Sequence, residues 1–169
     1  GADEPSVPGD PATLVYMDGM TPSKLLKAVS KGHVIVARYI TMEVYFLFEN
    51  KKYLPGDRIE ITGDSEFEND IVASVTIKIN EETYGKNIIP ELYLIENGVK
   101  REVVLEKRDE RTYMADVVTN WHTIDWEWKR FEVLSKDYGF LGYVNPIFHG
   151  RKKSKLKTFG EAVQLWRGQ

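Results

Sequence analysis

The residues best suited to chemistry are three tryptophans in the second half of the chain. Trp121 is followed by Trp126 and Trp128, and the latter two share one face of a strand because side chains alternate along extended backbone. Exposed rings in a row can stack on sugar rings, whereas large aromatic side chains also fill β cores. Two interpretations stay open: a carbohydrate-binding platform, or one tryptophan in the core with another covering an edge. All three are candidate ligand-binding residues.

Acidic side chains gather at two places. Asp125 and Glu127 share the strand face opposite Trp126 and Trp128, but no partner for general acid–base chemistry is visible, which favours two solvated carboxylates. The loop Gly63–Asp70 offers the oxygen ligands that calcium prefers. It lacks the spacing of an EF-hand, so a solvated loop is the favoured interpretation there too.

Other chemical motifs are missing from the sequence. His33, His122 and His149 are scattered without metal-ligand spacing, so each is expected at a strand end or in packing. The serines have no nucleophile-elbow context, and no glycine-rich phosphate loop occurs. The basic run Arg151–Lys157 could contact a phosphate, although a solvated tail is favoured. We therefore predict no catalytic residue and no cofactor in this chain.

Composition restricts the class of protein. The chain has 169 residues, of which 42% are hydrophobic and 29% charged, which is typical of a soluble globular protein. Its net charge of −3 argues against nucleic acid as a partner, and no apolar run is long enough to span a membrane. The absence of cysteine excludes disulfides and thiolate metal sites. Gly1 resembles a residue left by tag cleavage, which predicts that the native start is missing.

Hydrophobic periodicity predicts the architecture. From residue 41 to 149 the apolar side chains recur every second residue, and no helical pattern interrupts them. Turn signals separate the runs at regular intervals, which is typical of a sandwich. We predict a mainly β fold, an immunoglobulin-like antiparallel β-sandwich of about seven strands. The expected strands are 42–49, 58–62, 71–79, 91–96, 100–107, 111–119, 123–134 and 140–148, with turns at 50–52, 54–57 and 97–98.

A strand–helix–strand segment precedes the sandwich. Strands are expected at Thr13–Met17 and His33–Tyr39, and Thr21 and Pro22 begin a helix that Gly32 ends. At the other end, the capping-box spacing at Thr158 predicts a short helix through Trp166. We therefore divide the chain into residues 1–40, a sandwich domain at 41–149, and a basic tail with a helix at 150–169. The apolar face of the first helix consists of Leu25, Leu26 and Val29.

The order of these pieces resembles the end of a known superfamily. It looks like the closing segment of polymerase-and-histidinol-phosphatase (PHP) metallophosphoesterases, in the subgroup whose α/β barrel is followed by an immunoglobulin-like extension. In that subgroup an Asn-Pro-Ile-Tyr phrase ends the last strand, which corresponds here to Asn145–Phe148. The matching segments are Asp10–Tyr16, Met20–Pro22, Lys24–Val29, Gly32–Val36, Arg130–Val133 and Tyr138–Phe148.

The resemblance implies that residues 1–40 are the remnant of a barrel. In the superfamily, histidines and acidic residues hold divalent metals, and the last pair has the form Gly-Ser-Asp-x-His. Asp3 stands at the place of the aspartate and Pro5 at that of the histidine, so this chain would supply one metal ligand. A zinc, manganese or iron site would then belong to the full-length parent. We expect no manganese-dependent phosphoesterase activity from this chain alone, because one carboxylate does not make a catalytic metal site.

Two functions follow as hypotheses. In the first, the chain is a non-catalytic accessory domain that packs against the barrel of a PHP-like protein, shapes access to it or mediates assembly. That hypothesis predicts an exposed apolar patch at Leu25, Leu26 and Val29, the candidate interface residues. In the second, it is an independent carbohydrate-binding module, which requires two or more coplanar, exposed tryptophans. A homo-oligomer is a further open possibility, and neither nucleic acid nor a membrane is expected as a partner.

Overall fold

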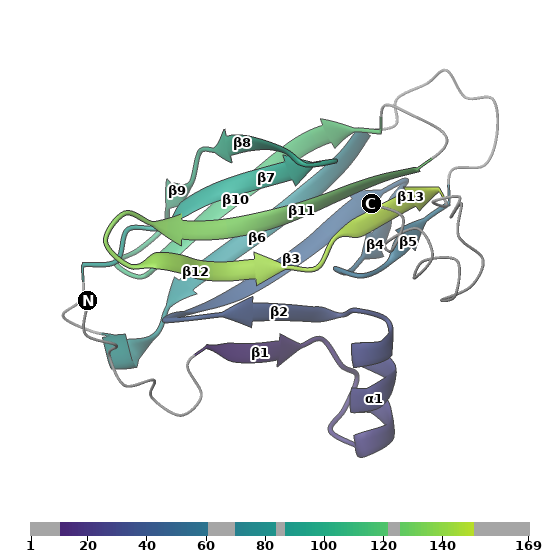
Figure 1. The fold of residues 1–169 in the computed structure, drawn as a ribbon, viewed down its shortest axis with the longest axis horizontal. Helices are drawn as coiled ribbons and strands as arrows, with labels where there is room; N and C mark the ends of the chain where they lie inside the picture. The colour runs from purple at the N-terminus through teal and green to yellow at the C-terminus, as the bar shows by residue number, and fades with distance from the viewer. Residues whose placement is uncertain (1–10, 61–69, 84–86, 122–125, 151–169) are drawn as a thin grey trace, which may run out of the picture.

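The computed structural model describes residues 11–60, 70–83, 87–121 and 126–150, in which two β-sheets pack face to face (Figure 1). Sheet A has the order β1-β2-β12-β11-β13-β5. In the same sheet, β7 pairs with both β11 and β8. Sheet B has the order β4-β3-β6-β10-β9. All pairs are antiparallel except β13 with β5. The predicted mainly β sandwich with a strand–helix–strand start is confirmed.

The elements have the following bounds. Sheet A contains β1 (Ala12–Val15), β2 (Val34–Ala37), β5 (Arg58–Ile59), β7 (Glu91–Glu96), β8 (Val99–Val103), β11 (Trp126–Ser135), β12 (Gly139–Val144) and β13 (Ile147–Gly150). Sheet B contains β3 (Ile40–Phe48), β4 (Lys51–Tyr53), β6 (Asp70–Ile79), β9 (Glu106–Lys107) and β10 (Thr112–Asn120). The helices are α1 (Pro22–Ser30) and a 3-10 turn, η1 (Glu81–Thr83).

The core lies between the sheets and follows the predicted alternation. In β3 the residues from Ile40 to Phe48 alternate between buried and solvent-facing, as a strand with one face in the core requires. Phe46 of sheet B stacks on Phe131 of sheet A with ring centroids 6.0 Å apart, and both side chains are fully buried. This contact joins the two layers near their centre.

Two tight hairpins set the register of their strands. Asn97 and Gly98 join β7 to β8, and both have positive φ angles, as a type I′ turn demands. Glu49 and Asn50 form the same kind of turn between β3 and β4. The turn lies at residues 49–50 and not at the predicted 50–52, because Lys51 and Lys52 already pair with Phe48 and Leu47 in the ladder.

Two predicted strands are interrupted in the structure. The segment 140–148 forms β12 and β13, which lie end to end beside β11, and the register advances by one residue between Glu132↔Tyr143 and Lys129↔Ile147. The break falls at Asn145 and Pro146, because proline cannot donate to the ladder. Likewise, residues 100–107 form β8 in sheet A and β9 in sheet B. These two breaks and the short strand β4 explain why the sheets contain more strands than the sequence predicts.

The helix α1 begins and ends where the sequence predicts. The hydroxyl oxygen of Thr21 accepts a hydrogen bond from the Lys24 N–H at 3.3 Å, and Gly32 follows the helix with φ +77°. The flanking strands β1 and β2 are antiparallel, and β2 pairs with β12, so the segment is joined to sheet A. The division of the chain at residue 40 remains a prediction of domain organisation.

Several predicted features lie outside the described residues: the acidic loop from Gly63 to Asn69, the basic run and the C-terminal helix. Asp70 is described, as the exposed first residue of β6. Within the described part of the chain, no helix has both the length and the hydropathy to cross a membrane.

Candidate functional site

The apolar face of α1 is exposed to solvent. The exposed fraction is 70% for Leu26, 49% for Val29 and 41% for Leu25, and Met20 just before the helix is 96% exposed. Ala28 is the buried residue of the helix. Figure 1 shows α1 at the lower right, outside the two sheets and next to the ends of β1 and β2. The sequence correctly placed these apolar residues on one helix, and the structure leaves that face uncovered.

The charged side chains of α1 are all basic. Lys24 and Lys27 lie in the helix and Lys31 is its C-cap residue, whereas the segment Pro22–Ser30 contains no acidic residue. Lys27 lies in the last turn, where a cation interacts favourably with the helix dipole. At 3.6 residues per turn, Lys24 and Lys27 project from the side of α1 opposite the apolar face and leave that face without a charged border from the helix itself.

A close contact between three segments fixes the C-terminal end of α1 to the sandwich. The side chain of Asn145 donates a hydrogen bond to the carbonyl oxygen of Gly32 at 2.9 Å, and the N–H of Gly56 donates to the carbonyl oxygen of Pro146 at 2.9 Å. Gly56 has φ +92°, and a Cβ there would collide with the backbone of Lys31 and Gly32. The break between β12 and β13 thus anchors the helix.

An imidazole–carboxylate pair supports the same contact. His33 Nε2 and Asp57 Oδ1 are 2.8 Å apart, and the other Asp57 oxygen accepts the Leu54 N–H at 2.8 Å. The side chains are 12% and 29% exposed, and no nucleophile completes a catalytic arrangement within the described residues. The pair therefore ties the start of β2 to the turn before β5.

The outer face of sheet A carries aromatic rings and cations. Trp126 and Trp128 point outward from β11 and are half-buried, and Phe148 is the direct cross-strand neighbour of Trp128. The Arg130 guanidinium lies 5.4 Å from the ring centroid of Trp128 and 4.3 Å from that of Tyr143. This arrangement is a cation–π ladder, so Arg130 already contacts rings that a sugar would need.

Trp121 does not belong to this outer surface. It is 4% exposed and packs in the core, where its ring lies 5.4 Å from that of His149 and 4.9 Å from the Lys129 ammonium. Of the two interpretations of the tryptophans, core packing is thus correct for Trp121. Trp126 and Trp128 share an outward face as predicted.

Three ionic side chains form a buried charged cluster at one end of the sandwich: Glu96, Glu127 and Lys129. Lys129 is fully buried and its ammonium lies 2.7 Å from Glu96, which also accepts hydrogen bonds from Thr119 and from Arg101. Glu127 is 2% exposed, so the prediction of a solvated carboxylate is wrong. It points into the core because it shares its strand face with Phe131, and it accepts a hydrogen bond from the Asn97 amide at 3.1 Å.

The electrostatics of the cluster centre on Glu96. Burial alone would raise the pKa of its carboxyl group, but hydrogen bonds from Lys129, Thr119 and Arg101 and the charge of Lys129 outweigh burial and lower the pKa to about 2. The group is therefore ionised in the folded protein at all ordinary pH values. Lys129 and Glu127 present almost no surface to solvent, so the cluster offers no accessible site for a substrate.

The remaining candidates are placed as follows. His149 is buried and its Nδ1 contacts the carbonyl oxygen of Ile59, so it is a packing residue as expected. His122, Asp125 and Asp3 lie outside the described residues. The described part of the chain contains no group of three histidine, aspartate or glutamate side chains arranged to hold a metal. No family model and no curated protein matches the chain.

The sequence analysis missed the buried cluster. A signal was present, because Glu127 and Lys129 occupy the positions that extend the apolar face of Phe131 and Val133. Charged residues at two successive core positions indicate a buried pair or network, since an isolated buried charge is too costly. The partner, Glu96, is 33 residues away in sequence, and only the pairing of β7 with β11 reveals it.

Proposed function

We propose that the chain is a non-catalytic accessory domain that docks against a second domain through the apolar face of α1. The observation that carries the proposal is the exposure of Leu25, Leu26 and Val29 on one face of α1. Apolar side chains clustered on a firmly held helix are a typical docking element. The resemblance to the end of PHP metallophosphoesterases supports an α/β barrel of the same gene product as the docking partner.

Labelling of single cysteines tests the docking, because the chain contains no native cysteine. Leu26→Cys should react rapidly with a maleimide in this chain and be protected in the longer gene product that carries the barrel. Val118→Cys is the matched control, since Val118 is 60% exposed on the outer face of sheet B and should react equally in both proteins. Equal reactivity of Leu26→Cys in the two proteins would refute the docking. Equal protection of both sites would also refute it, because the effect would not be confined to α1.

The parentage has its own test. The upstream residues of the gene product should include a strand that ends in His-x-His, the metal-binding signature of the superfamily. This chain alone should show no manganese-dependent hydrolysis of a generic phosphoester, whereas a longer protein with an intact metal set should hydrolyse it. A gene product without an upstream barrel would refute the assignment, even if α1 docked elsewhere.

A second candidate function is carbohydrate binding on the outer face of sheet A. The observation in its favour is that Trp126, Trp128 and Phe148 project from that face on paired strands. Oligosaccharide binding should protect the outer tryptophans from acrylamide quenching, while Trp121 contributes a constant, poorly quenched signal. Replacing Arg130 by alanine should expose the rings and increase binding if this function is correct. Unchanged quenching across a panel of oligosaccharides would exclude it.

A further inference from the structure

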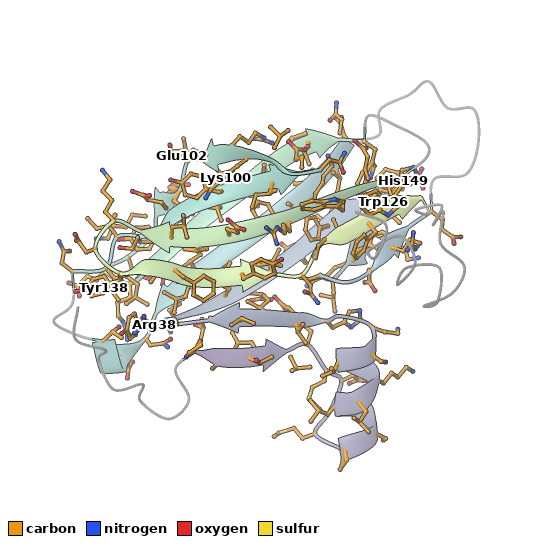
Figure 2. The ribbon with its side chains drawn as sticks, in the orientation of Figure 1. Arg38, Lys100, Glu102, Trp126, Tyr138 and His149 are labelled. Carbon is orange, nitrogen blue, oxygen red and sulfur yellow. The ribbon has the colours of Figure 1, made fainter. Side chains whose placement is uncertain are left out.

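We propose that β8 is a homodimer interface, in which two copies of the chain join their A sheets through antiparallel β8 strands. Among the described residues β8 pairs with β7 alone, so its other edge carries free backbone donors and acceptors. Figure 2 shows Lys100 and Glu102 on this strand, at the margin of the molecule. The proposal concerns a surface distinct from α1 and does not depend on the proposed function.

The hairpin determines which backbone groups are free. In a two-residue hairpin, the residues beside the turn exchange backbone hydrogen bonds, and every second residue along the strand does the same. Glu96 and Val99 flank the turn, so Val99, Arg101 and Val103 direct their backbone groups to β7. Lys100 and Glu102 therefore direct their N–H and C=O groups outward, toward a second strand.

The charges favour one symmetric register, in which the two copies of Arg101 face each other at the axis. A two-fold axis at Arg101 places each Lys100 opposite Glu102 of the second copy, which completes four backbone hydrogen bonds and two ion pairs. Axes at Lys100 or at Glu102 would also align free backbone groups, but they would place like charges opposite each other. Two copies of the same strand thus complement each other in one register, as an isologous interface requires.

The neighbouring side chains fit this register. Val99, which is 72% exposed, would lie opposite Val103 of the second copy, and Val104, which is 90% exposed, lies just beyond the strand. The two arginines at the axis are each compensated within their own chain, because Arg101 Nε lies 3.1 Å from Glu96. On the outer face, the Lys100 ammonium lies 3.5 Å from Glu132 and 4.0 Å from the ring centroid of Tyr93, so it reaches back across β7 and turns toward the free edge to meet Glu102 of the second copy.

Sedimentation equilibrium of the chain tests the interface. We expect a reversible dimer, which Lys100→Glu or Glu102→Lys weakens by about tenfold or more, because either single change places like charges opposite each other twice. The double variant Lys100→Glu/Glu102→Lys restores the opposite charges and should restore association. Glu106→Lys makes the same change of charge on β9 and should leave the dimer intact.

The outcomes are distinguishable. A monomer at concentrations up to about 1 mM, where weak interfaces associate, would overturn the proposal. So would single variants that dimerise normally, or a double variant no better than the single ones. Amide hydrogen exchange of the unmodified chain gives an independent measurement: protection of the Lys100 and Glu102 amides should rise with concentration, and protection that stays constant contradicts the interface even if a variant fails to fold.

Discussion

Replacing Glu96 by glutamine tests whether the buried charged cluster stabilises the fold. The substitution keeps the shape of the side chain and removes the charge that lies 2.7 Å from the Lys129 ammonium. Lys129 is fully buried, so the variant leaves a buried cation without its ion-pair partner, a change that costs about 3–5 kcal/mol when one member of a buried pair is lost. Because Glu96 is itself 19% exposed, we expect a loss near the lower end, about 3 kcal/mol.

Denaturant unfolding followed by tryptophan fluorescence measures this loss, since Trp121 packs beside Lys129 and reports on the cluster. Glu106→Gln is the matched control: Glu106 lies 2.8 Å from Arg108, but both side chains are more than half exposed, so the loss should be below about 0.5 kcal/mol. The double variant Glu96→Gln/Lys129→Met removes both charges and should recover much of the stability, because apolar packing replaces the buried cation.

The same pair predicts a pH dependence. The pKa of the Glu96 carboxyl group falls from 4.5 to about 2 on folding, so its ionised form contributes to the free energy of unfolding. This contribution is complete above pH 4.5 and is lost as the pH falls toward 2. At about 1.4 kcal/mol per pKa unit the contribution is at most about 3 kcal/mol, and partial exposure reduces it to about 2. Glu96→Gln should flatten this part of the pH profile. A variant as stable as the parent, with an unchanged acid profile, would refute the reasoning.

Three further substitutions test the contacts around α1 and β3. Gly56→Ala should lower the free energy of unfolding by about 3 kcal/mol, because the positive φ of Gly56 and the backbone beside it exclude a side chain. Gly139→Ala is the control in the same unfolding assay: Gly139 also has a positive φ but faces open space, so the loss should be about 1 kcal/mol. Asn145→Ala removes the hydrogen bond to Gly32, so the free energy of unfolding should fall by about 1 kcal/mol and amide hydrogen exchange in α1 should become faster. Unchanged exchange in α1 would contradict the anchoring role of Asn145. Tyr16→Phe leaves the Val44 N–H without the hydroxyl 2.6 Å away and should cost 1–3 kcal/mol, and a neutral effect in thermal unfolding would show that this contact contributes nothing.

Local rules made much of the fold predictable. The alternation of Ile40–Phe48, the hairpin at Asn97-Gly98 and the cap at Thr21 each follow from a few neighbouring residues, and each is present in the structure. Strand breaks were harder to predict, because continuous periodicity hides a one-residue shift in register. The shift at Asn145-Pro146 depends on β11, which is the partner strand of both β12 and β13.

The candidate site also combines features that the sequence predicts with features that depend on distant strand pairings. The apolar face of α1 was predictable from helical spacing, since Leu25, Leu26 and Val29 lie within two turns. The alternation around Glu127 and Lys129 indicated buried charges but not their partners. The burial of Trp121 was not predictable from the residues nearby. It depends on which strand face lies toward sheet B, and hence on pairings between residues far apart in sequence.

The anchoring of α1 bears on what the helix does. A helix that merely connected two strands could lie loosely, but this one is fixed by Asn145, which directly follows β12, and by Gly56 shortly before β5, where only glycine fits. Those contacts hold the C-terminal end of the helix while its leucines remain exposed. For the docking proposed above, such firm anchoring would reduce the conformational entropy lost on binding. The Asn-Pro break therefore has two structural consequences: it ends the pairing of β12, and it places the Asn145 amide where it holds the C-terminal end of α1.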